Sequence, residues 1–323
     1  MAKTKKKSMK RASRFKMIEN ALLVALFLTG AYLMNNYLFT YPIIISVLQG
    51  VALISTLAIA ESIVLASGGI DFSIASIALL SSSMIFYLVE KNITNVYFAI
   101  VISIAAGGVI GLINGLFIAK IKIQPIIVTM ATSLFAYGVS GAITNNIVLF
   151  DTCEEFAFFK TVPVFVIPTT FIIALCILLY CFALFKFTII GRQVFAVGGS
   201  EESAKLSGLN VDRIKIFSYC GAGLLAGVGG LMVLADSALA ARFYGSGPEV
   251  QVIFAAVIGG VSLYSGARIF FRVFVGATII SIINRMIYGL FVFNYMGSII
   301  IGLLVLVIIA LRTSVFKQEK TDR

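Results

Sequence analysis

Long apolar runs recur along almost the whole chain, and they restrict its fold more than any other feature. A helix needs about 20 mostly apolar residues to cross the hydrocarbon core of a bilayer. Of the 323 residues, 60% are hydrophobic and only 12% are charged, whereas about 25% of the residues of a soluble domain are charged. An outer-membrane barrel would instead show alternating segments of about ten residues. The sequence therefore predicts an all-α, polytopic membrane helix bundle.

The apolar runs divide into about ten transmembrane helices. We expect them near residues 18–40, 43–66, 72–90, 96–119, 126–148, 164–185, 216–235, 250–267, 273–293 and 297–312. This division gives a basic N-terminus at 1–17, a transmembrane domain at 18–312 and a tail at 313–323. The longest polar interruption of the domain is the loop 186–215, which follows the sixth predicted span.

Basic residues are distributed unevenly between the two sides that these spans define. If residue 1 lies inside and the spans alternate, only Lys91, Lys160, Arg242 and Arg285 of the 25 Lys and Arg residues fall outside the cytoplasmic pieces. Cytoplasmic loops of membrane proteins carry such an excess of positive charge. The pattern predicts an N-in/C-in topology. The net charge of +11 then indicates contact with the lipid bilayer and gives no reason to expect nucleic acid as a partner.

Several classes of chemistry lack their residues. The chain has no histidine, and its four cysteines form no CxxC pair, which excludes HExxH zinc sites and Ser-His-Asp triads. We find neither a GxxxxGK[ST] loop nor a GxGxxG turn after a strand. The sequence therefore predicts no enzyme, no metal and no bound cofactor. If ATP drives this protein, a separate chain must bind it.

The central loop contains a short helix with its own start and stop signals. Ser200 is suited to cap the N-terminus, and Glu201 and Glu202 follow in the first turn, where the helix dipole favours acids. Gly208 is suited to the C-terminal stop. Two interpretations remain open, a solvated connection between spans or a coupling helix that inserts into a soluble motor subunit. The residues concerned are Gly199, Ser200, Glu201, Glu202, Ala204, Lys205 and Gly208.

Polar residues also interrupt the spans themselves. The segment 67–73 combines two glycines, two serines and Asp71, and irregular backbone at membrane depth occurs only inside protein or beside a cavity. We expect Asp71 to cap the next helix, with Ser73 in its first turn. Glu61 lies in the middle of a span, where a carboxylate is costly and must face a partner or a cavity. A Glu61–Arg285 ion pair is one such arrangement.

For these polar residues two roles remain open, helix–helix hydrogen bonding and lining of a substrate pathway. The candidates are Glu61, Asp71, Ser73, Asn114, Asn145, Asn284 and Arg285.

Two outside loops, 149–163 and 236–249, contain acids and aromatic residues. They are either ordinary interfacial loops or a docking surface for an external partner, with Asp236, Arg242 and Glu249 as candidates.

Glycines recur every four residues at Gly107, Gly111 and Gly115, so they share one face of a helix. A second group crowds the seventh predicted span around Gly223 and Gly227. Small residues allow helix backbones to approach closely in lipid, where no hydrophobic force brings helices together. The pattern predicts tight helix packing.

Three motifs resemble one transporter family. They are Gly68–Ser73 (GGIDFS, similar to the family's GGIDLS), Gly191–Gly208 (similar to its GR…GGNxxAARLSGI loop) and Glu249–Leu263 (similar to its E…AAVxLGGTSL). Over nearly all of residues 20–312 the chain resembles the permease subunits of bacterial ABC importers for ribose, xylose, arabinose, galactose and related sugars. It departs from the family at Ala75, Ser265, Arg268 and Arg272, where the family has glycine.

The resemblance implies a transport subunit for a pentose or hexose in the bacterial cytoplasmic (inner, or plasma) membrane. It implies a second permease copy or a close paralogue, ABC ATPase subunits that carry ATP and Mg on the cytoplasmic side, and an extracytoplasmic solute-binding protein. Glu202, Ala204 and Gly208 fall on the family's coupling pattern. A nucleoside importer permease is the alternative. A self-contained ion-coupled carrier that uses Glu61 and Asp71 is more remote.

Overall fold

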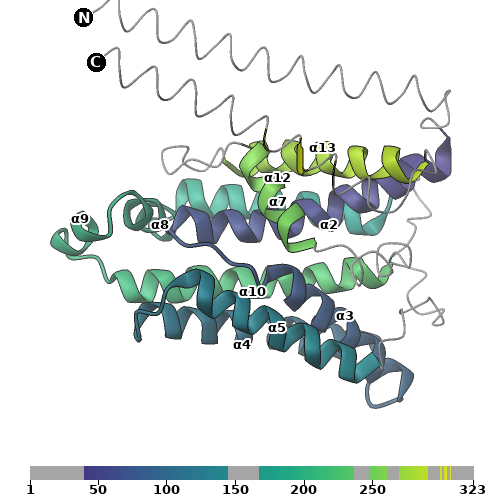
Figure 1. The fold of residues 1–323 in the computed structure, drawn as a ribbon, viewed down its shortest axis with the longest axis horizontal. Helices are drawn as coiled ribbons and strands as arrows, with labels where there is room; N and C mark the ends of the chain where they lie inside the picture. Colours follow the sequence, from purple (N-terminus) through teal and green to yellow (C-terminus); the bar gives the residue numbers. More distant parts are fainter. Residues whose placement is uncertain are drawn as a thin grey trace, which may run out of the picture. The chain divides into compact units, whose positions relative to one another are not determined.

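The computed structural model describes residues 40–144, 167–235, 248–259 and 269–289, together with residues 299, 302, 303 and 306. This part of the chain is helical and contains no strand (Figure 1). Contacts divide the chain into one compact unit of residues 48–278 and another of residues 1–47 and 279–323. All contacts below lie within the first unit. The helices are α2 (Tyr41–Ala66), α3 (Ile74–Glu90), α4 (Val96–Ala119), α5 (Pro125–Thr144), α7 (Thr169–Phe187), α8 (Ile189–Gly199), α9 (Glu201–Leu206), α10 (Val211–Ala235), α12 (Pro248–Ile258) and α13 (Ile269–Gly289).

Five of the described helices, α2, α4, α5, α7 and α10, are long and apolar enough to cross a membrane. α3 and α13 contain shorter apolar stretches. Their positions confirm the predicted polytopic helix bundle over the described part of the chain. The predicted span 18–40 and most of the span 297–312 lie outside it.

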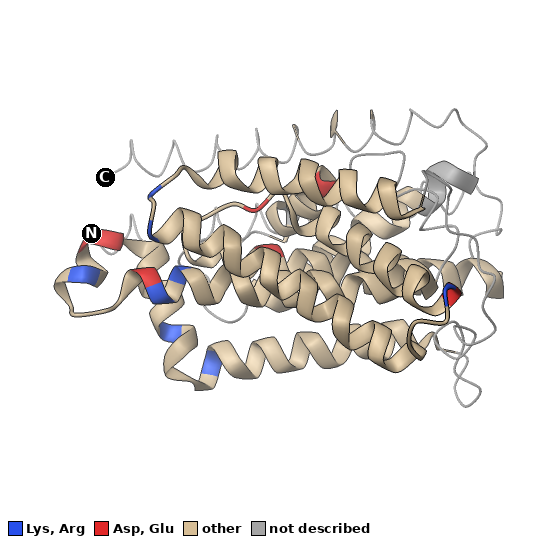
Figure 2. Cartoon of the chain, turned by 90° about the horizontal axis from the view of Figure 1, so that it is seen from below, with Lys and Arg blue, Asp and Glu red and all other residues tan. Residues whose placement is uncertain are grey.

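Two helices in the predicted loop 186–215 differ from the prediction. α8 occupies residues that we expected to be loop, and α10 begins at Val211 rather than near residue 216. The early start has a local cause, because the side-chain oxygen of Asn210 accepts a hydrogen bond from the Arg213 N–H at 3.0 Å. Asp212 in the first turn is favoured by the helix dipole. Figure 2 shows that most Lys and Arg residues of the described chain lie at the end of the helices that carries α8 and α9.

α10 packs along α4 and α3, and glycines make the α4–α10 contact possible. A Cβ atom added at Gly111 would collide with the Tyr219 carbonyl, and one added at Gly223 would collide with the Gly107 carbonyl. The two backbones therefore touch directly. This confirms that the repeated glycines of α4 form a packing face.

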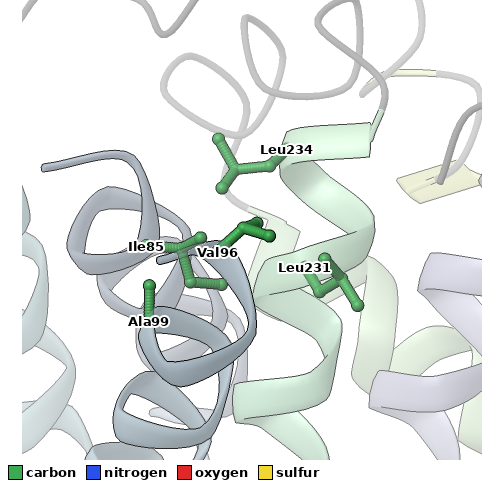
Figure 3. Packing of buried hydrophobic residues seen from close by; sticks show 5 residues of the cluster. All are labelled: Ile85, Val96, Ala99, Leu231 and Leu234. Atoms are coloured by element: carbon green, nitrogen blue, oxygen red, sulfur yellow. The ribbon is translucent and has the colours of Figure 1, made fainter. Parts of the chain in front are cut away.

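An apolar cluster holds α3, α4 and α10 together away from the α9 end of these helices. It consists of Ile85, Val96, Ala99, Leu231 and Leu234, all of them buried (Figure 3). The side chains of Leu231 and Leu234 lie one turn apart on α10, so one face of this helix closes the cluster.

The glycine contact gives a matched test on one helix. Gly223→Ala places a Cβ against backbone, so we expect a loss of about 1–3 kcal/mol from overpacking and a lower Tm of the purified protein in detergent. Gly221→Ala is the control, because nothing lies within 4 Å of a Cβ there. Alanine also favours helix over glycine, so this control should unfold at or above the wild-type Tm. Equal Tm values for the two variants would contradict the contact.

Candidate functional site

A break in the helical backbone forms the centre of the polar interior. α2 ends at Ala66 and the helix resumes at Ile74, with Gly68 in the left-handed region at φ +86°. Gly198 of α8 lies directly on this break, because a Cβ at Gly198 would collide with the Ala66 carbonyl. The break therefore contacts the helix that precedes α9.

Asp71 and Ser73 form a tight turn before α3. One Asp71 carboxylate oxygen, Oδ1, accepts hydrogen bonds from the Ser73 N–H at 2.8 Å and from the Ser73 hydroxyl at 2.6 Å. The prediction that Ser73 lies in the first helical turn is wrong, since Ser73 is the N-cap residue and α3 begins at Ile74. Asp71 binds both Ser73 donors and so extends the turn by one residue. Asn114 Nδ2 of α4 donates to the Ser73 hydroxyl at 2.9 Å.

Glu61 of α2 completes this group, which we call the acidic centre (Glu61, Asp71, Ser73 and Asn114). Its Oε1 accepts one long hydrogen bond, 3.4 Å from the Asp71 N–H. The side chains of Glu61, Asp71 and Asn114 are buried, with at most 2% of each residue exposed. One oxygen of each (Glu61 Oε2, Asp71 Oδ2 and Asn114 Oδ1) has no hydrogen-bond partner among the described residues. The acidic centre thus joins α2, α3 and α4 through polar groups.

A second polar surface, the serine face, runs between α3 and α5. The hydroxyls of Ser76 and Ser133 are 2.6 Å apart, and those of Ser83 and Ser140 are 2.5 Å apart. Both pairs repeat after seven residues, about two helical turns, so the hydroxyls stay in register along the two helices. These serines were not among the predicted site residues, although the same seven-residue spacing in both segments could have indicated a shared polar face. Hydroxyl groups can both donate to and accept from a polyhydroxylated ligand.

Glu249 lies at one end of the serine face. It is in the first turn of α12, and its Oε1 accepts a hydrogen bond of 3.0 Å from the Ser76 hydroxyl. The side chain is half-buried. The role predicted for it, in external docking, therefore stays a prediction, and the structure adds a contact to α3.

Most of the remaining predicted site residues cannot be placed against the acidic centre or the serine face. Asn145, Asp236 and Arg242 lie outside the described residues. Arg285 belongs to α13 but its side chain is not among those described, so the Glu61–Arg285 pair stays a prediction. Asn284 lies on α13 and is half-buried.

α9 has the predicted start and stop. The Ser200 hydroxyl accepts a hydrogen bond from the Ser203 N–H at 3.2 Å, and Gly208 ends the segment at φ +81°. Ala204 packs inward, whereas Glu202 and Leu206 point to the outside, with 85% of Leu206 exposed. An exposed leucine beside a carboxylate is suited to a protein partner.

Ion pairs connect α9 to the bundle. The Glu201 carboxylate lies 2.6 Å from the Lys215 ammonium of α10 and 3.1 Å from that of Lys205. The hydrogen bond from Lys215 is the main cause that lowers the pKa of Glu201 below its usual value. Asp212 of α10 in turn pairs with Lys122 at 2.7 Å and with Lys120 at 3.2 Å, both before α5. Two surface segments are thus tied to the same end of α10.

Known proteins resemble this chain over most of its length. A family profile described as branched-chain amino acid transport system / permease component matches residues 43–309. The ribose import permease protein RbsC of Escherichia coli (strain K12) is 29% identical over 296 residues, which cover 90% of this chain and 92% of the relative. RbsC of Bacillus subtilis (strain 168) is 31% identical and covers 83% of this chain and 84% of the relative.

A further relative is the L-arabinose ABC transporter permease protein AraH of Azospirillum brasilense. It is 34% identical over 239 residues, which cover 72% of this chain and 68% of the relative. No solved structure was found to match the chain.

The tether between α9 and α10 can be tested by amide hydrogen exchange. Lys215→Met removes the cation that binds Glu201, and partly exposed pairs contribute about 1 kcal/mol or less. We therefore expect up to about fivefold faster exchange in α9 and no change in α4. Arg213→Met is the control, because Arg213 is exposed and lies two residues before Lys215 in the same helix. Equal exchange rates in the two variants would contradict the tether.

Acid should have the same effect as Lys215→Met. The folded-state pKa of Glu201 is lowered, so the pair stabilises α9 above the unfolded-state pKa and this stabilisation is lost as the pH falls through the folded-state value.

Proposed function

Because the chain belongs to the family of the branched-chain amino acid transport system / permease component, we propose that it is the membrane-spanning permease subunit of an ATP-driven ABC importer. Its cargo is a simple sugar of the pentose or hexose type. This choice is supported by the relatives' names, which specify ribose and arabinose. The importer assignment rests on α9, a capped helix beyond the ends of the spans, which exposes Glu202 and Leu206 to a partner protein.

The subunit lies in the bacterial cytoplasmic membrane with both ends inside. The loop that carries α8 and α9 then faces the cytoplasm. The gathering of Lys and Arg at this end of the helices supports the orientation, because cytoplasmic ends carry the excess of positive charge. The ends 1–17 and 313–323 are the cytoplasmic terminus and tail of this arrangement.

Four partners complete the transporter. ABC ATPase subunits bind α9 from the cytoplasm and hold the ATP and Mg, since the sequence has no nucleotide-binding motif. A solute-binding protein delivers the sugar on the other side. A second permease, identical or a close paralogue, forms the other half, and lipid surrounds the pair.

Movement of α9 reaches the interior by two contacts. α8 lies between α9 and the α2–α3 break, where Gly198 touches the Ala66 carbonyl. Lys215 links α9 to α10, which packs along α4 and α3. ATP-driven closure of the ATPase subunits therefore shifts the packing of α3 against its neighbours and switches the permease between two packed states.

The serine face is the part of the interior that best fits a sugar. Its hydroxyls and the Glu249 carboxylate offer hydrogen bonds of both senses between α3, α5 and α12. A nucleoside importer would use the same coupling, but the names of the relatives do not favour it. An ion-coupled carrier would need no ATPase, which separates it from this proposal experimentally.

The coupling prediction concerns transport by the assembled importer in liposomes. The wild-type chain with its ATPase and solute-binding protein should take up radiolabelled ribose or arabinose only with ATP, and uridine should not compete. Glu202→Ala combined with Leu206→Ser should abolish uptake while the helices remain folded, because the surface that receives the ATPase is lost. Cys176→Ala, at an exposed position of α7 away from α9, is the control. Uptake by the purified chain alone would overturn the proposal.

The pathway prediction concerns the serine face. Glu249→Gln removes the negative charge from the hydrogen bond with Ser76, and Ser76→Ala removes that bond altogether. For both variants we expect uptake of the transported sugar to fall about tenfold or more, with ATP-driven coupling retained. Ser82→Ala is the matched control on α3, because the Ser82 hydroxyl donates to the Leu79 carbonyl of its own helix at 2.7 Å. Equal uptake by all three variants would rule out the serine face as the route.

A further inference from the structure

The acidic centre has too few hydrogen-bond donors for its acceptors. Three buried oxygens, Glu61 Oε2, Asp71 Oδ2 and Asn114 Oδ1, have no hydrogen-bond partner within the described part of the chain. Asn114 is bound to the centre through its other amide atom, which donates to the same Ser73 hydroxyl that donates to Asp71. Buried polar atoms are almost always paired. Three unpaired acceptors in one place therefore indicate a donor other than these protein groups.

The charges around the acidic centre indicate what that donor is. The groups around the centre are Glu61 of α2, Asp71 of the break, Ser73 at the N-cap of α3, Asn114 of α4 and Tyr219 of α10. The Tyr219 hydroxyl is directed at the Ile70 carbonyl, 3.4 Å away. Among the Lys and Arg residues whose side chains are described, which do not include Arg285, none forms an ion pair with either carboxylate.

We propose that Glu61 and Asp71 form a proton-binding site, in which Glu61 is a neutral carboxylic acid and Asp71 a carboxylate. Two adjacent carboxylates that are removed from water and lack a cation are strongly unfavourable. One bound proton removes one of the two charges. It also turns one oxygen of Glu61 from an unpaired acceptor into an O–H donor.

The hydrogen bonds assign the proton to Glu61. Asp71 accepts two short bonds from Ser73 through one oxygen, which stabilise its ionised form. Glu61 accepts one long bond from the Asp71 N–H, so its charge has little compensation. The proton therefore resides on Glu61, whose charge would receive fewer and longer hydrogen bonds than that of Asp71.

A proton fits this place better than a metal ion does. A cation such as Na⁺ or Ca²⁺ needs an open volume lined by several oxygens. Here the backbone is in close contact with its neighbours, since a Cβ atom at Gly69 would collide with the Tyr219 hydroxyl. The proton requires no such volume.

The site does not depend on the transport proposal, because it concerns the packed bundle itself. The folded chain binds one more proton at neutral pH than the unfolded chain, where a water-exposed glutamic acid is ionised. Folding stability must then fall as the pH rises, by at most about tenfold in the folding equilibrium for each pH unit. Uptake assays are therefore not needed to test it.

Infrared spectroscopy of the purified full-length chain in detergent tests the proton directly. At neutral pH we expect a C=O stretching band of a protonated carboxyl group, which disappears in Glu61→Gln. Glu90→Gln is the control, because Glu90 ends α3 and is exposed. Absence of the band from the wild-type chain, or its persistence in Glu61→Gln, would overturn the proposal even if a variant folded poorly.

Thermal unfolding supplies a second readout. Glutamine imitates a neutral glutamic acid, so Glu61→Gln should keep the wild-type Tm near neutral pH and lose less stability toward alkaline pH. Asp71→Asn should unfold earlier, since it weakens both bonds from Ser73. Replacing sodium by choline at constant ionic strength should leave every Tm unchanged. A wild-type Tm that rises with sodium, or a Tm of Glu61→Gln as low as that of Asp71→Asn, would contradict a proton site.

Discussion

The interior of this protein is organised by one constraint, the need to satisfy a broken stretch of backbone where lipid offers no hydrogen bonds. Between Ala66 and Ile74 the chain leaves the helical pattern, so its polar groups must find partners inside the protein. Asn114 on α4 and Tyr219 on α10 reach the break from two different helices. Both are available there because the glycine contact brings α4 and α10 together next to them.

The same close contacts connect the break to the surface. Glycine at position 198 lets α8 lie on the end of α2, and α8 leads directly into α9. A shift of α9 must move its neighbours as well. The backbone of α8, which leads into α9, touches the end of α2 at Gly198, and the Glu201–Lys215 pair holds α9 to α10. Tightly packed interfaces of this kind switch between discrete arrangements rather than deforming gradually.

The features that the sequence predicted well depend on local signals. Helical runs, the four-residue glycine repeat and the Ser200 and Gly208 termini of α9 follow from periodicity and capping, which act within a few residues. The serine face was missed because Ser76 and Ser133 become partners only when α3 and α5 pack in one register. Glu249 was assigned to an outside loop for the same reason. The exact start of α3 was missed by one residue, because Asp71 binds both donors of Ser73 and this local turn does not follow from residue type alone.

The two groups of acids differ in cost, and this difference separates their roles. Glu201 and Asp212 lie at partly exposed positions beside lysines, where ion pairs contribute little to stability. Their role is therefore to orient α9 and the loop before α5. Glu61 is fully buried and has no ion-pair partner among the side chains that the structure describes, and a hydrophobic residue there would have no charge to remove from water. A sequence that keeps a carboxyl group at this position gains a group that can exchange a proton, which an apolar side chain cannot do.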